Sequence, residues 1–120
     1  MLSTEATMTK HMISFPSGAM QLQPDEFEQA SVDSHTVVRE AKEAGVWVFG
    51  GGVNESTPPV RVDAERNVAE GTNPETAQLA GGYTILELPT IDEAYEWAAK
   101  FAKACRCQQE VRAFWNDPES

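Results

Sequence analysis

Residues 82–93 have the sequence GYTILELPTIDE, and this stretch predicts a strand that leads directly into a helix. Side chains alternate in character over residues 82–88, so Tyr83, Ile85 and Glu87 share one face of the predicted strand. A carboxylate on a largely apolar face, such as that of Glu87, lies at a rim or is paired. We expect Arg112, on the last strand of the chain, to be its cross-strand partner.

The predicted helix that follows this strand has a start signal and a periodic apolar face. Thr90 and Glu93 have the spacing of a capping box, in which the Thr90 hydroxyl accepts the amide proton of Glu93 and the Glu93 carboxylate reaches back. Apolar residues recur at three- and four-residue steps from Ile91 to Ala102. Acidic residues come early and basic residues late, which complements the helix dipole.

Upstream, similar patterns predict another strand and another helix. Residues 11–15 alternate, with His11, Ile13 and Phe15 on one face. Pro24 suits a first helical position, and apolar residues then recur at helical spacing over about twenty residues. Gly45 is the residue type expected just past the end of such a helix.

Three further segments complete the predicted order. Residues 46–49 are apolar on both faces and end at Gly50–Gly52, which we interpret as a bulge or a tight strand end. Residues 60–62 and 67–69 predict a hairpin, and residues 110–115 alternate as a last strand. The order strand–helix–strand–hairpin–strand–helix–strand is the ferredoxin-like split βαβ pattern. The predicted fold class is therefore α+β, with both helices on one face of an antiparallel sheet.

The second face of this sheet has no predicted element to cover it. It nevertheless carries large apolar side chains, including part of residues 46–49. An exposed apolar sheet face marks an interface or a ligand site. The economical solution is a homodimer in which two sheets face each other.

Composition and charge exclude several classes of function. The chain has 120 residues, 9 of them basic and 19 acidic, with a formal net charge of −10. This balance argues against nucleic acid and against an anionic membrane surface as partners. The length corresponds to one domain. We expect a disordered leader over residues 1–10, the domain over residues 11–116 and a tail over residues 117–120.

The cysteines and glycines do not predict a cofactor or a metal. Cys105 and Cys107 are too close for an unstrained bridge, and the leader lacks the apolar run of a secretory signal, so we expect a reduced pair in a cytoplasmic protein. Two histidines and one Cys-x-Cys do not make a metal-ligand set. Gly50–Gly52 lacks the Lys-Ser/Thr of a phosphate-binding loop.

Residues 70–83, EGTNPETAQLAGGY, are similar to the signature stretch of the DGPF branch of the YCII-related family. That signature has Asp-Gly-Pro-Phe, then Ala-Glu-Thr, a polar run, Gly-Gly and an aromatic residue, and it aligns here without a gap. Further similarities are Ala44-Gly45-Val46, Gly51-Gly52 and the Ile-Asp-Glu-Ala sequence of residues 91–94. The resemblance covers roughly residues 11–115.

This resemblance implies a dimeric α/β barrel and a candidate chemistry. Some YCII-like members resemble enzymes that act on small ring-cleavage products, with a His–Asp pair in proton transfer. His35 lies in the first helix, where the histidine of those enzymes lies, although one residue nearer the helix end. Glu70 stands where the signature has its aspartate, whereas Thr72 and Asn73 replace its proline and phenylalanine.

The candidate site residues fall into two groups. The catalytic candidates are His35, because histidine titrates near neutral pH, and Glu70. Simpler interpretations are an exposed or packing histidine at the flank of the helix and a solvated turn carboxylate. The candidate ligand-binding residues are His11, Trp47, Tyr83, Glu87 and Arg112. His11 lines the space between two sheets only if its strand face is the dimer face.

Two functions follow from these observations. The first is a homodimeric binding protein that holds a small molecule in the cleft between its sheets. The second is a small-molecule lyase or isomerase that uses a carboxylate/His pair for proton transfer. A histidine within hydrogen-bond reach of Glu70 or another carboxylate inside a cleft favours the enzyme, whereas exposed and unpaired histidines favour the binding protein.

Overall fold

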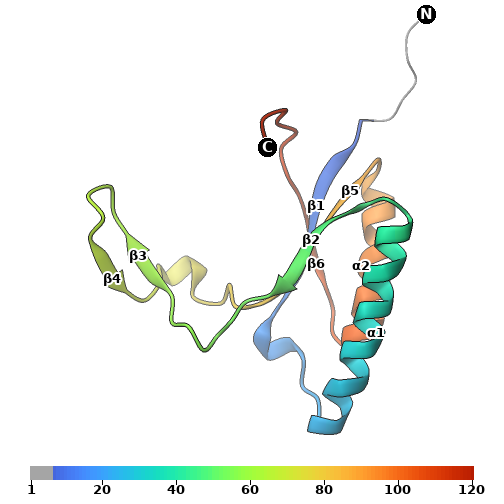
Figure 1. Cartoon of the computed structure of the whole chain (residues 1–120), viewed down its shortest axis with the longest axis horizontal. Coiled ribbons are helices and arrows are strands. Elements are labelled where there is room, and N and C mark those ends of the chain that lie inside the picture. Colours follow the sequence, from blue (N-terminus) through green and yellow to red (C-terminus); the bar gives the residue numbers. More distant parts are fainter. Residues whose placement is uncertain (1–6) are drawn as a thin grey trace, which may run out of the picture.

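A computed structural model of the chain describes residues 7–120 (Figure 1). The element order matches the predicted one, with two short 3₁₀ turns added. The elements are β1 (Thr9–Pro16), η1 (Ser17–Ala19), α1 (Pro24–Glu43), β2 (Trp47–Gly52), β3 (Val60–Val62), β4 (Val68–Glu70), η2 (Pro74–Thr76), β5 (Gly81–Leu88), α2 (Ile91–Cys105) and β6 (Glu110–Ala113).

The main sheet has the strand order β2-β5-β1-β6, and every neighbouring pair is antiparallel. Both helices cover one face of this sheet (Figure 1). The predicted α+β class, with two helices on one face of an antiparallel sheet, is therefore confirmed. The opposite face, which carries Lys10, Met12, Tyr83, Ile85 and Glu87, is called the open face below.

The core lies between the sheet and the helices. Ile13, Leu86 and Leu88 are the largest fully buried side chains, and all three come from the two central strands. The helices contribute mostly small residues, which lets them lie close to the sheet and to each other. Those buried helix residues are Ala30, Val37, Ala41, Ala94, Ala98, Phe101, Ala104 and Cys105.

The helix ends follow the predicted signals with one difference. Gly45 has φ +75°, and the chain turns there while the amide of Val46 donates to the carbonyl of Ala41. At the start of α2, the Thr90 hydroxyl accepts from the amide of Glu93 at 3.2 Å, as predicted. The structure shows no reciprocal bond from Glu93 to the backbone of Thr90, and Oε2 of Glu93 is buried without a hydrogen-bond partner.

Some predicted boundaries were wrong. Gly50–Gly52 do not end their strand but form its second half, and the irregularity in β2 lies between Trp47 and Phe49. The last strand stops at Ala113 instead of residue 115. Of the predicted leader, residues 1–6 lie outside the described residues, whereas Thr9 and Lys10 already belong to β1.

The predicted hairpin forms, and it stands apart from the main sheet. β3 and β4 make a separate two-stranded antiparallel sheet, which lies on the side of the main sheet away from the helices (Figure 1). The radius of gyration of the Cα atoms is 16.8 Å. A compact chain of this length has a radius of about 14 Å. This hairpin with its flanking loops, residues 53–71, is called the arm below.

None of the helices within residues 7–120 has the length and apolar character needed to cross a bilayer. Among the glycines, the closest backbone approach lies at the start of β5. Gly81 has φ +146°, and a Cβ atom at this position lies 2.0 Å from the carbonyl oxygen of Phe15. Only glycine fits there, since both the dihedral angle and the space exclude a side chain.

We expect Gly81→Ala to destabilise the protein by about 2–4 kcal/mol, because the added methyl group forces strands β1 and β5 apart. Gly18→Ala is the matched control, since a Cβ atom there meets nothing within 4 Å. Urea unfolding followed by circular dichroism measures both free energies of unfolding. Equal stability of the two variants contradicts this account of Gly81.

Candidate functional site

A cleft of about 410 Å³ lies between α1 and the adjoining ends of β2 and β5. Its volume falls in the range of small-molecule sites, which is about 300–1,000 Å³. Of the predicted site residues, His35, Trp47 and Tyr83 line it, although the strand register places the Tyr83 side chain on the open face. The other polar lining residues are Ser34, Lys42, Thr84, Cys105 and Gln109. We call this space the helix-side cleft.

α1 places His35 and Lys42 on the same wall of the helix-side cleft. The two residues are seven positions apart, which is two helical turns, so their side chains project from one face. The Lys42 ammonium lies 5.7 Å from the centroid of the Trp47 ring, within the distance of a cation–π contact. His35 is exposed, and the hydroxyl of Ser31 lies 3.4 Å from its Nδ1 atom.

Glycines shape the opposite wall of the helix-side cleft. A Cβ atom at Gly50 lies 2.5 Å from the indole of Trp47, and one at Gly82 lies 2.6 Å from the ring of Phe15. Both rings therefore occupy space that the glycines leave free. This gives the predicted Gly-Gly pair of residues 81–82 and the Gly50–Gly52 run a packing role, which requires no bound phosphate.

The charge of the helix-side cleft differs from that of the chain. The chain carries 19 acidic residues, yet none of the described residues that line this cleft is an aspartate or a glutamate. Lys42 contributes a cation, while His35, Gln109 and Thr84 contribute hydrogen-bonding groups over an apolar floor of Ile13 and Phe101. Such a lining suits a small molecule with an apolar body and an anionic end.

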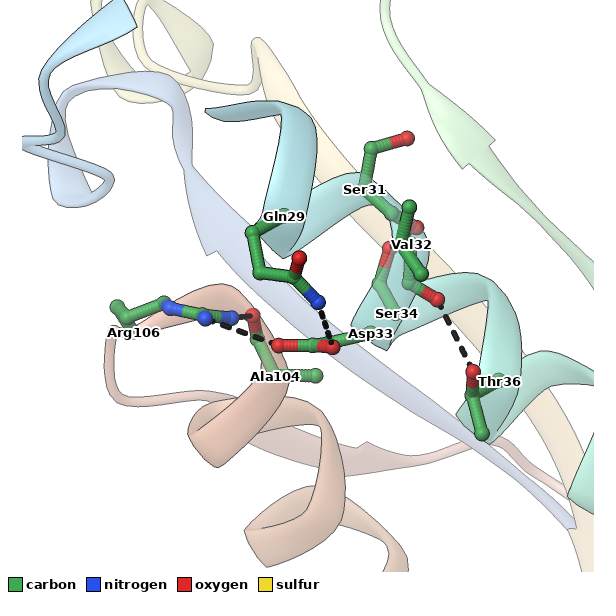
Figure 2. A network of polar contacts seen from close by, with 8 residues as sticks. All are labelled: Gln29, Ser31, Val32, Asp33, Ser34, Thr36, Ala104 and Arg106. Atoms are coloured by element: carbon green, nitrogen blue, oxygen red, sulfur yellow. Dashed lines mark hydrogen bonds and ion pairs between the residues drawn. The ribbon is translucent and has the colours of Figure 1, made fainter. Parts of the chain in front are cut away.

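A polar network fixes the part of α1 that presents His35 (Figure 2). Asp33 accepts a hydrogen bond from Gln29 at 2.8 Å and forms an ion pair with Arg106 at 2.9 Å, which joins α1 to the end of α2. The hydrogen bond from Gln29 and then that from Arg106 hold the pKa of the Asp33 carboxyl below its usual value. Arg106 also donates to the carbonyl of Ala104 (Figure 2).

His11 does not lie on the open face, where a second sheet could pack against it. It pairs with Leu86 on the helix-covered face, is 3 % exposed, and its Nδ1 atom lies 3.0 Å from the carbonyl oxygen of Thr9. The prediction of His11 as a ligand residue required its strand face to be the dimer face, but the helices of the same chain cover that face. Its face of β1 packs under the helices because Ile13 and Phe15 share that face.

The predicted ion pair of Glu87 and Arg112 was wrong. β1 lies between β5 and β6, so the two residues are not on neighbouring strands. Glu87 pairs instead with Lys10 at 3.3 Å, and Arg112 pairs with Glu110 at 3.2 Å. Both pairs lie on the open face and are largely solvent-accessible.

Glu70 is remote from both histidines. It is the last residue of β4 in the exposed arm, where its carbonyl accepts from Arg61 at 3.2 Å. His35 and His11 come from the body of the protein, and no hydrogen bond joins either of them to a carboxylate among the described residues. The predicted carboxylate/His pair does not form within one chain.

The open face has hollows of its own. Tyr83 and Arg112 line one of about 240 Å³ between the sheet and residues 74–79. A larger one of about 640 Å³ lies between residues 114–118 and the sheet, and it is lined by Val48, Ile85 and Trp115 among others. None of the predicted site residues lines the larger hollow. Its walls belong to the apolar sheet face for which the sequence predicts no covering element.

Sequence reasoning missed Lys42, Cys105 and Gln109 as lining residues of the helix-side cleft. The seven-residue spacing from His35 was a signal for Lys42, whereas nothing local distinguishes Gln109, which reaches the cleft from the loop before β6. Within residues 7–120, no three side chains of His, Cys, Asp or Glu gather in a way that could hold a metal ion.

Comparison with known protein families identifies the family of this chain. The family model of the YCII-related domain matches residues 10–113, which is most of the chain. A search of curated proteins gives no match. The matched region contains the sheet, both helices, the arm and every residue that lines the helix-side cleft.

The two thiols are free in the structure, and we expect them to differ in reactivity. Burial, and then the neighbouring Cys107, raise the pKa of Cys105 to about 11, so at neutral pH only roughly one molecule in ten thousand carries its thiolate. Burial also raises the pKa of Cys107, but that thiol is only half-buried. Iodoacetamide at pH 7 should alkylate Cys107 at least about tenfold faster.

Trypsin cleaves after Arg106 and so separates the two thiols for mass spectrometry. The rate at Cys105 should rise steadily as the pH approaches 11, because the thiolate is the reacting form. Cys107→Ser is the control that measures the labelling rate of Cys105 without the neighbouring thiol. Faster labelling of Cys105 than of Cys107 contradicts the burial described here.

Proposed function

The chain belongs to the YCII-related family, and from this we propose that it is a homodimer that binds a small organic anion. We place the anion in the helix-side cleft, in contrast to the initial expectation of a site between two sheets. The observation that carries this proposal is the absence of acidic residues among the described residues of the cleft lining, in a chain with a net charge of −10. Acidic residues elsewhere repel an anion, so a site free of them is a site where one can bind.

The lining supplies each contact that such a ligand needs. We place a carboxylate of the ligand near the ammonium of Lys42, where opposite charge favours it. The apolar body then lies against Trp47 and Phe101. An aromatic or unsaturated body gains the most binding energy, because it can stack on the indole ring of Trp47.

The homodimer is supported by the composition of the open face. Phe49 is 62 % exposed and Trp115 is 95 % exposed, and Val48 lies beside them at 42 %. Charges on this face come in balanced pairs, Lys10 with Glu87 and Arg112 with Glu110. Two such faces can meet without the repulsion that a net charge of −10 otherwise implies.

A second candidate function is that of a lyase or isomerase, and the position of His35 in the cleft lining favours it. A histidine at the mouth of the cleft can accept a proton from a bound acid. The proposed carboxylate partner, Glu70, lies on the arm instead. Chemical change of an added acid, seen by NMR over hours and lost in His35→Gln, distinguishes catalysis from binding alone.

We expect benzoate to raise the melting temperature of the protein and benzamide, its neutral isostere, to raise it less, because only benzoate can pair with Lys42. Ligand at 100 times its dissociation constant stabilises the folded state by about 2.7 kcal/mol. Lys42→Gln should weaken benzoate binding about five- to tenfold, through loss of one charge-assisted contact. Lys103→Gln is the matched control, since Lys103 does not line the cleft. Equal shifts with benzoate and benzamide contradict an anion site.

Sedimentation velocity at micromolar concentration should show a species of twice the chain mass. Ile85→Lys places a cation on the apolar open face and should shift this species to the monomer. Ile91→Lys is the control, because Ile91 is 42 % exposed at the start of α2, which covers the other side of the sheet. A monomeric wild-type chain, or a dimer that is unaffected by Ile85→Lys, contradicts the sheet-to-sheet arrangement.

A further inference from the structure

The arm carries an apolar surface that the rest of the chain does not cover. Every residue from Gly51 to Gly71 is exposed. In the register of β3 and β4, Val60 pairs with Glu70, and Val62 pairs with Val68, so the three valines share one face of the hairpin. Their exposed fractions are 50 %, 59 % and 59 %. The other face carries Arg61 and Ala69.

The turn of the arm is nevertheless well ordered. The Asp63 carboxylate accepts hydrogen bonds from the amides of Glu65 and Asn67 and from the Asn67 side chain, at 2.8–3.0 Å. These bonds, with that from the Asn67 side chain first, hold the pKa of Asp63 below its usual value. The turn therefore keeps its bonds until the pH falls through that lowered value. The arm is preformed, yet a two-stranded hairpin without cover is at best marginally stable in water.

The position of the arm bears on which surface covers its valines. It lies on the open-face side of the main sheet, away from the helices (Figure 1), and β3 and β4 pack mainly on each other. The open face and the arm, which carries the three exposed valines, thus lie on the same side of the molecule (Figure 1).

We propose that the arm docks through Val60, Val62 and Val68 on a second copy of this chain, and so brings Glu70 to that copy. The inference rests on the homodimer proposed above and names a second part of its interface. By two-fold symmetry each copy gives one arm and receives one.

The size of the interface favours a second copy as the occupant. Side chains alternate along strands, so the four strands of the main sheet present about 13 residues on the open face. One side of a stable interface usually contributes roughly 20–30 residues. The open face alone falls short of that number, and the arm together with the C-terminal residues that follow β6 supplies the difference.

Charge also favours a second copy over a strongly charged partner protein. The arm carries Arg61 and Arg66 against Asp63, Glu65, Glu55 and Glu70, which leaves it a formal net charge of −2. The open face is balanced through its two ion pairs. The arm thus holds −2 of the net charge of −10 and the two ion pairs of the open face add none, so most of the acidic excess lies outside these two surfaces and two acidic chains can associate.

The test compares dimerisation of variants on the two faces of the hairpin. Val62→Ser with Val68→Ser removes the paired valines, whereas Arg61→Ser with Ala69→Ser changes the opposite face of the same strands. Sedimentation equilibrium over a concentration series should give a dimer dissociation constant raised about tenfold or more for the valine variant, because buried apolar area is lost. The control variant should stay within about twofold of the wild type.

Hydrogen exchange of the arm amides gives a second measurement on the wild-type chain. Protection of residues 60–70 should appear in the dimer and disappear on dilution to the monomer. Protection that does not depend on concentration means that the arm packs on its own chain, and it overturns the inference. An unchanged dimer dissociation constant in the valine variant contradicts the arm contact alone. A wild-type chain that stays monomeric contradicts both the arm contact and the proposed homodimer.

Discussion

The backbone contact between Gly81 and Phe15 sets the geometry on which the rest of the molecule depends. The amide of Ser17 and that of Val53 also converge on this point, through the carbonyls of Ala80 and Gly81. The contact fixes the register of β1 against β5, and the register decides which side chains face the helices. A shift of β1 by one residue would move Ile13 out of the core and turn Lys10 inward, away from Glu87.

Much of the fold could be predicted because its signals are local. The alternation of residues 82–88, the periodicity of both helices, and glycine at position 45 each depend on neighbours within a few residues. What failed depends on contacts between distant segments. Glu87 and Arg112 were matched across strands that β1 separates. Gly50–Gly52 were expected to end their strand, whereas they continue it and Gly50 makes room for Trp47.

The candidate site could be predicted only in part, for the same reason. Residue type alone selected His35, Trp47 and Tyr83, and the fold brings them to one cleft. Residue type also selected His11 and Glu70, which lie in the core and on the arm respectively. Helical spacing would have added Lys42, but Gln109 reaches the cleft only through the tertiary path of the chain.

The segment between β2 and β5, residues 53–80, includes the arm and leaves and re-enters the body at one place, because Gly52 pairs with Gly82 on the adjacent strand and the amide of Val53 donates to the carbonyl of Gly81. An insertion whose two ends are held together adds little entropy cost as it lengthens. Its sequence can therefore diverge among relatives without moving a residue of the sheet or of the helix-side cleft. Association and ligand choice are in this sense separate traits, which evolution can alter one at a time.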